Sequence, residues 1–297
     1  MQPTESPLRT ITAGFARDRI AAAAFAVLIL VLLSAVFAPV VTPQNPYDLA
    51  QLDILDAKLP PGATSPGGMS YWLGTDEQGR DMFSAILYGL RISLGVAVVA
   101  TLFALALGLA IGLLAGYAGG WVDGLIMRLV DLQLSFPAIL IALVLLAVTG
   151  PGVDKIVIAL IAVQWAYYAR TVRGIALIEK RKEYVEAARC LALGPSRIVF
   201  RHILPNCLPP LIVVATIQVA HAIALEATLS FLGLGVPITA PSLGLLIANG
   251  FVHLLSGKYW ISFFPGIALL ITIAAINLVG DRLRDILNPR LGSHYAA

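Results

Sequence analysis

The sequence predicts an all-helical integral membrane protein with six transmembrane helices. Hydrophobic residues make up 59% of its 297 residues and charged residues only 12%, and the mean hydropathy is +0.87. Soluble domains carry about 25% charged residues, so this chain could not cover a surface that faces water on all sides. It also contains several charge-free runs of the roughly 20 residues that cross a bilayer core about 30 Å thick.

Six segments of this kind are expected to cross the membrane. The first follows a basic tail, residues 1–19, and is longer than the roughly 7 to 15 apolar residues of a cleavable signal peptide. The fourth is short, so we expect it to continue past Arg170 and Arg173, whose long side chains can reach the headgroups. The stretch 227–257 is also uncharged, but its glycines and prolines predict a loop with short or re-entrant pieces. The expected spans are residues 20–41, 92–122, 132–153, 156–173, 203–225 and 259–280.

Basic residues predict the orientation, because Lys and Arg gather on the cytoplasmic side of a membrane. With the N-terminus inside, only five of the 20 Lys and Arg residues fall outside. These are Lys58, Arg80, Arg91, Lys155 and Lys258. This orientation makes residues 1–19 and 282–297 cytoplasmic tails, residues 42–90 an acidic external loop and residues 91–281 the core of five further helices.

Signatures of enzymatic chemistry are missing from the sequence. It has no G-x-x-x-x-G-K-[ST] phosphate loop, no H-E-x-x-H zinc pattern and no G-x-S-x-G or S-x-x-K nucleophile pattern. Its net charge of +3 is too small for a nucleic-acid surface, and its two cysteines are too few for a disulfide framework. We expect no catalytic, cofactor or metal site in this chain, so energy for transport would come from an ion gradient or a separate subunit.

The cytoplasmic loop of residues 179–207 carries the most specific pattern in the chain. Residues 184–193 are rich in helix-forming side chains, and Gly194 with Pro195 predicts where that helix ends. A second short helix is expected from Ser196 onward, before the chain returns to the membrane.

The spacing within the first of these helices predicts which side chains share a face. Tyr184, Ala188 and Leu191 are separated by three or four residues and should lie together. Ala187 and Ala188 are small, so a partner surface could approach the helix backbone closely.

Glu186, Ala187 and Ala188, followed by Ile203, Leu204 and Pro205, resemble the E-A-A…G…I-x-L-P pattern of inner-membrane permease subunits of ABC importers. In that family the loop forms a coupling helix that docks into a cleft of an ATPase subunit, which would explain the missing phosphate loop. The usual glycine of the pattern is Ala192 here, so Gly194 is expected to supply the turn. The alternative is a solvated amphipathic helix on the membrane surface. The resemblance assigns the docking to Tyr184, Glu186, Ala187, Ala188, Gly194, Leu204 and Pro205.

Three further motifs resemble the permeases of dipeptide, oligopeptide and nickel importers. The sequence GTDEQGRD at residues 74–81 is similar to their G-T-D-x-x-G-R-D segment, and residues 226–235 and 277–285 resemble the C-type member of the paired permeases. In the first motif we expect a local turn in which Arg80 pairs with Asp81.

The resemblance implies a type I ABC importer permease fold in a bacterial inner membrane. The implied partners are a homologous permease, two cytoplasmic ATPases that bind ATP and Mg, an external solute-binding protein and the lipid bilayer, with no nucleic acid. Import by alternating access would carry dipeptides or oligopeptides, with nickel or other peptide-like solutes as the alternative.

Glycine and polar residues within the spans are further candidates. Four glycines recur every four residues in the second span, a spacing that favours close helix packing. These are Gly108, Gly112, Gly116 and Gly120. Polar groups inside a membrane usually face a bundle interior or a water-filled path. Gln218, His221 and Glu226 are the best candidates for a path or gate, although a structural hydrogen bond between helices is an equal alternative for each.

Two other classes of protein are disfavoured. A gradient-driven carrier requires coupling acids at mid-membrane, whereas Asp131 and Glu226 lie near the ends of their predicted spans. An intramembrane enzyme requires a nucleophile paired with a base, and the candidate pair is His221 with Glu226. Their spacing of five residues does not place both side chains on one face of a helix.

Overall fold

The protein is helical throughout most of residues 15, 18–237, 239–240 and 242–287, which are the residues that the computed structural model describes. The predicted all-helical class is therefore confirmed, while the predicted tails lie partly outside the described residues. The longer helices are α2 (Arg19–Val36), α4 (Met82–Ala118), α5 (Gly120–Leu134), α6 (Ala138–Thr149), α7 (Val153–Glu179), α10 (Leu204–Phe231) and α12 (Trp260–Leu287). The shorter helical segments are α3 (Ala38–Val41), η1 (Leu49–Gln51), η2 (Ile54–Asp56), α8 (Glu183–Cys190), α9 (Pro195–Ile198), the π-helical turn η3 (Val199–Ile203), α11 (Leu243–Phe251) and η4 (Leu254–Ser256).

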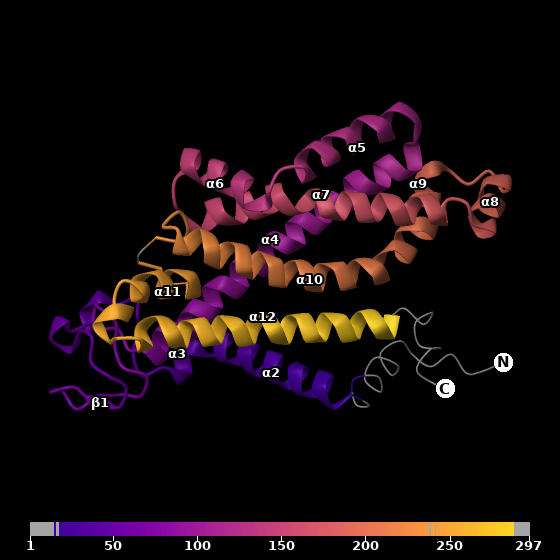
Figure 1. The fold of residues 1–297 in the computed structure, drawn as a ribbon. Helices are drawn as coiled ribbons and strands as arrows, with labels where there is room; N and C mark the ends of the chain where they lie inside the picture. The colour runs from indigo at the N-terminus through magenta and orange to yellow at the C-terminus, as the bar shows by residue number, and fades with distance from the viewer. Residues whose placement is uncertain (1–14, 16–17, 238, 241, 288–297) are drawn as a thin grey trace.

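The ends of the molecule differ in structure. A small antiparallel hairpin, β1 (Ala63–Thr64) and β2 (Ser70–Tyr71), lies at one end, and α8 and α9 lie at the other (Figure 1). The long helices α7, α10 and α12 connect these two ends. The predicted external and cytoplasmic loops are thus separated by the length of the helix bundle.

The described residues contain fewer helices that are long and apolar enough to cross a membrane than the predicted six. Among the described residues, four helices are long and apolar enough to cross a membrane, or up to five if the bent pair α5 and α6 is one span. The helix α7 has 27 residues but carries charged side chains near both ends. The predicted count of six is not confirmed.

Two predicted boundaries differ from the structure for local reasons. α4 begins at Met82, inside the predicted external loop, because the Asp81 carboxylate caps it by accepting a hydrogen bond from the Ser84 N–H at 2.9 Å. The helix then continues through the exposed Arg91, so a charge-free run underestimates its length. The predicted third span, residues 132–153, coincides mostly with α6. The chain bends by 86° between α5 and α6, because Pro137 disfavours helical geometry at the residue before it.

Arg170 and Arg173 of α7 have protein partners. Arg173 Nη2 lies 2.6 Å from Asp123 Oδ2 on α5, and Arg170 pairs with Asp131 on the same helix. These two ion pairs connect α5 to α7, whereas the sequence predicted that the arginines extend to the headgroups.

Three of the four predicted packing glycines lie against α7. A Cβ atom added at Gly108 would lie 2.4 Å from Tyr168 Cβ, and one at Gly112 would lie 2.6 Å from a backbone oxygen of α7. Gly116 is similarly close to the next turn of α7. Gly120 differs, because it lies at the start of α5 with a φ of +57° and open space around it. The glycine face therefore ends with α4.

The uncharged stretch after the fifth predicted span contains a short helix. α10 continues to Phe231, beyond the expected end at residue 225, and α11 follows after a loop. Leu243 and Leu246 of α11 are fully buried, and the helix packs against α4, α10 and α12. α11 therefore closes the hairpin end of the bundle between three long helices.

Candidate coupling loop and membrane path

The first helix of the loop ends earlier than predicted. α8 stops at Cys190, and Ala192 adopts a left-handed φ of +54°. The Leu193 N–H donates to the Ala188 carbonyl oxygen at 3.1 Å, and the Ala192 N–H donates to the Arg189 carbonyl oxygen at 2.9 Å. This is the Schellman pattern, in which the left-handed residue is usually glycine.

The turn is therefore made by Ala192, and the prediction that Gly194 supplies it is wrong. Gly194 has an ordinary φ of −62° and precedes α9. The hydrogen-bond pattern requires the left-handed residue two positions after the last helical residue, a place that Gly194 does not occupy.

Ala188 faces the interior of this chain. It is 4% exposed and Val185 is 0% exposed, and both join a buried cluster with Val172 of α7. Tyr184 and Leu191 are exposed at 36% and 74%. The predicted shared face therefore holds for Tyr184 and Ala188, which both meet the chain's own membrane helices. It is wrong for Leu191, which lies just past the end of α8 and is exposed.

The outer surface of α8 is open to a partner. Besides Tyr184, the exposed side chains of α8 and of the following turn include Glu183, Glu186, Ala187, Arg189, Cys190 and Leu191. Of the other residues assigned to docking, Gly194 and Pro205 are exposed and Leu204 is partly buried. The loop thus presents a mixed acidic, basic and small-residue surface at the end of the bundle.

The Tyr184 hydroxyl connects α8 to two membrane helices. It donates to the carboxylate of Glu179, the last residue of α7, and accepts from Asn206 Nδ2 in the first turn of α10 at 3.1 Å. Lys182 Nζ lies 2.6 Å from the same carboxylate. Burial, followed by the hydrogen bond to Glu179, raises the pKa of Tyr184 to about 12. The hydroxyl is therefore protonated at neutral pH and remains a donor.

Sequence reasoning missed Glu179, Lys182 and Asn206 in this joint. Glu179 and Lys182 lie at the start of the loop and Asn206 lies at its end. The spacing of residues along one helix therefore cannot predict that they meet. A polar Asn directly after Pro205, where α10 enters the membrane, was the available signal.

Gln218 and His221 lie beside a pocket within the membrane helices. The pocket has a volume of about 330 Å³ and is bordered by α6, α7 and α10. Gln218 is 6% exposed, and its Oε1 atom lies 3.0 Å from His221 Nδ1. These two predicted path residues are therefore neighbours on one helix.

Glu226 lies elsewhere and is 0% exposed. Its carboxylate accepts hydrogen bonds from Ser93 Oγ of α4 at 2.8 Å and from Ser230 Oγ of α10 at 2.7 Å. Ser93 Oγ also lies 3.4 Å from the Leu243 N–H at the start of α11. This arrangement joins three helices, which is the structural alternative that the sequence left open.

The external motif at residues 74–81 forms a buried ion pair different from the predicted one. Arg80 Nε lies 2.6 Å from Asp76 Oδ2, and both side chains are 1% exposed. Asp81 instead caps α4, and burial raises the pKa of its carboxyl group. A Cβ atom on Gly79 would lie 2.1 Å from a neighbouring carbonyl oxygen, so this tight fold requires glycine. The predicted pairing of Arg80 with Asp81 is wrong.

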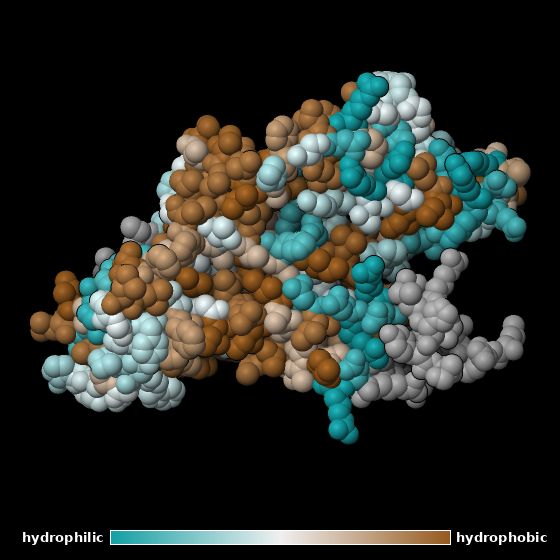
Figure 2. Space-filling view, in the orientation of Figure 1, coloured by the Kyte–Doolittle hydropathy of each residue, from teal (hydrophilic) through white to brown (hydrophobic). Residues whose placement is uncertain are grey.

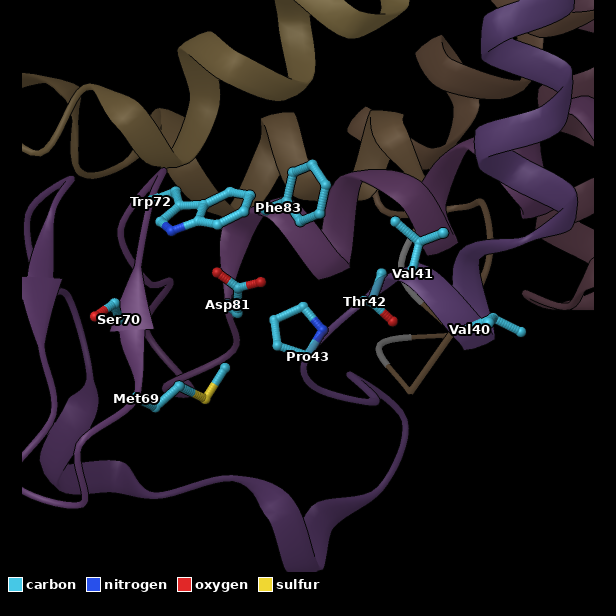
Figure 3. Close-up of a pocket in the computed structure, with 9 residues that line it drawn as sticks. All are labelled: Val40, Val41, Thr42, Pro43, Met69, Ser70, Trp72, Asp81 and Phe83. Atoms are coloured by element: carbon cyan, nitrogen blue, oxygen red, sulfur yellow. The ribbon is translucent and has the colours of Figure 1, made fainter.

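A pocket of about 560 Å³ lies next to this motif (Figure 3). The rings of Trp72 and Phe83 border it, with centroids 5.6 Å apart, and Pro43 and Met69 face them across the pocket. Asp81 is the one charged side chain among the lining residues. The pocket suits an apolar group.

Comparison with known proteins gives consistent matches. Residues 108–293 match the family described as binding-protein-dependent transport system inner membrane component, and residues 6–61 match the N-terminal TM domain of oligopeptide transport permease C. The dipeptide transport system permease protein DppC of Escherichia coli (strain K12) is 42% identical, over 96% of this chain and 94% of that protein. The di/tripeptide transport system permease protein DppC of Pseudomonas aeruginosa (strain UCBPP-PA14) is 37% identical, over 96% and 93%.

A solved structure shows the same fold. An inward-facing structure of the MetNI methionine ABC transporter matches with a TM-score of 0.57 and 22% identity, over 69% of this chain and 97% of that chain.

The fold and the loop between α7 and α10 together define a permease subunit with the type I ABC importer fold. The chain belongs to the family of binding-protein-dependent transport system inner membrane components, and within it resembles the C-type permeases of peptide importers. The family predicted from the motifs is confirmed. Its apolar helices and its family make it a multi-pass membrane protein.

Proposed function

We propose that this chain is the permease subunit of a peptide importer and pairs with a homologous permease to form the path. Two cytoplasmic ATPases supply the energy and bind ATP and Mg, and an external solute-binding protein delivers the peptide. This chain supplies neither a cofactor site nor hydrolysis. The peptide relatives, similar over nearly their whole length, support this substrate class.

The outer surface of α8 carries the proposal that the ATPase docks on this loop. One face of α8 is buried against α7 and α10, and its other face is exposed. A force on that exposed face would therefore be transmitted to two membrane helices. Alternating access requires such a connection, because ATP binding must move the membrane halves.

The test is co-purification of the ATPase with variants of this surface. Ala187→Arg places a long charged side chain on the exposed face, and we expect loss of ATPase retention because the contact must then desolvate it. Ala50→Arg, exposed at the hairpin end, is the matched control and should retain the ATPase. Equal retention in both variants would show that α8 is not the docking surface. Ala188→Arg is not a suitable variant for this test, because it would disrupt the buried cluster of this chain.

The orientation proposed is both termini in the cytoplasm. Cys190 is exposed on α8, and Thr64→Cys would place a thiol on the exposed part of the hairpin. An impermeant thiol reagent should label Thr64→Cys from outside in a background of Cys190→Ala and Cys207→Ala, but should not label Cys190 of the wild-type protein. Labelling of Cys190 from outside would show that α8 lies on the external side and that the proposed orientation is wrong.

A further inference from the structure

The lining of the pocket between α6, α7 and α10 contains no Asp, Glu, Lys or Arg. Figure 2 shows hydrophilic side chains in a hollow at the centre of the molecule, where α7 and α10 lie in Figure 1. The polar lining residues are Gln164, Tyr167, Gln218, His221 and Thr228. The remaining lining residues are apolar, so any polar recognition must come from these amide, hydroxyl and imidazole groups.

A chain of hydrogen bonds holds two of these groups in place. Thr101 Oγ1 of α4 donates to Gln164 Oε1 of α7 at 3.3 Å, and Gln164 Nε2 donates to the Gln218 carbonyl oxygen of α10 at 3.1 Å. Gln218 Oε1 then lies 3.0 Å from His221 Nδ1. Gln164 and Gln218 are 3% and 6% exposed, so the chain is fixed within the bundle as far as His221, which is exposed.

After this contact, the side chains of Gln218 and His221 still offer at least one donor and one acceptor. If His221 Nδ1 carries the proton, it donates to Gln218 Oε1, which leaves the amide N–H as a donor and Nε2 of the ring as an acceptor. If the proton is on Nε2, the amide turns over and donates to Nδ1, which leaves Nε2–H as the donor and the amide oxygen as the acceptor. Either tautomer of the neutral ring therefore presents the same complementary pair.

We propose, on the basis of the peptide-import function above, that Gln218 and His221 bind the backbone N–H and C=O of one residue of the transported peptide. In an extended chain these two groups of one residue point to the same side, as they do in an antiparallel sheet. A neighbouring donor and acceptor can therefore bind both. Recognition is independent of the peptide side chain, and the apolar lining accommodates side chains of different kinds.

The test compares trialanine with an analogue in which the ester oxygen replaces the N–H of the central residue. The assembled importer, with its partner permease, ATPases and binding protein, is placed in vesicles, and ATP-driven uptake of both probes is measured at saturating concentrations. The ratio of amide to ester uptake is taken within each variant, so differences in the amount of folded protein cancel. Because the same binding protein serves every variant, a change in the ratio comes from the permease.

One of the two variants Gln218→Leu and His221→Phe, the one that removes the acceptor of the peptide N–H, should lower this ratio by roughly two- to tenfold, the size of one lost hydrogen bond. The other removes the donor to the peptide C=O, which both probes carry, and should leave the ratio unchanged. Thr228→Val is the matched control, because Thr228 lines the same pocket but its hydroxyl already donates to the Ala224 carbonyl oxygen at 2.7 Å. An unchanged ratio in both variants would overturn the inference while leaving the import function intact. A wild-type complex that takes up neither probe with ATP would overturn the proposed function itself.

Discussion

Replacing Tyr184 with phenylalanine tests whether α8 transmits force through a rigid joint. The change removes only the hydroxyl that donates to Glu179 and accepts from Asn206. A hydrogen bond to a charged group contributes about 1.5 to 3 kcal/mol. Because Tyr184 is 36% exposed, water can partly replace it, and we expect the lower limit of about 1.5 kcal/mol. That free energy corresponds to roughly tenfold in the equilibrium between fixed and loosened α8.

The assay has two readouts on the assembled importer. Amide hydrogen exchange in residues 183–190 should accelerate by up to about tenfold in Tyr184→Phe, and the amount of peptide imported per ATP hydrolysed should fall. Tyr259→Phe is the control, because Tyr259 is exposed at the other end of the bundle. Unchanged exchange in α8 together with unchanged coupling would refute the reasoning that this hydroxyl fixes the coupling helix.

Three further substitutions test local structure, each by thermal melting of the purified protein. Ala192→Gly should stabilise the protein by about 1 kcal/mol, because glycine adopts the left-handed φ without strain; a lower melting temperature would contradict the Schellman turn. Asp81→Asn should stabilise the protein at neutral pH, since the raised folded-state pKa means that folding favours the uncharged form. The gain should vanish below about pH 4, where the carboxyl group is protonated in both states, and a gain that persists there would contradict this cause. Gly112→Leu should destabilise by several kcal/mol through steric overlap with α7, whereas Gly95→Leu on the same helix meets open space and should be nearly neutral.

Much of the helical fold could be predicted from charge-free runs, because the bilayer excludes charges from long segments. Charge-free runs underestimate the length of a helix that contains a charged residue near its end. Arg91 is exposed on α4, so the helix extends past it toward Met82. The ion pairs of Arg170 and Arg173 with α5 could not be predicted either, because they depend on how a bent helix pair folds back on α7.

The coupling loop was predicted from a local motif, but the direction of its side chains was not. Periodicity identified a helix with small residues and could not show that the chain's own cluster covers Ala188. The turn at Ala192 was missed for a different reason. A preference for glycine in left-handed positions is statistical, and the hydrogen-bond pattern at the end of α8 placed alanine there instead.

Glu226 provides a final test, because a buried acid in a transporter can serve either structure or transport. Its carboxylate accepts from Ser93 and Ser230 and joins α4 to α10, with α11 attached through Ser93. Serine hydroxyls both donate and accept, so Glu226→Gln can re-form these bonds without a charge and should retain folding and import within a few-fold. Glu226→Ala leaves the hydroxyls unpaired beside a cavity and should cost about 3 kcal/mol of stability. The measurement is import normalised to the amount of folded permease. If Glu226→Gln folds normally but abolishes import, the carboxylate acts in transport, and the assignment of Glu226 as a joint between three helices is wrong.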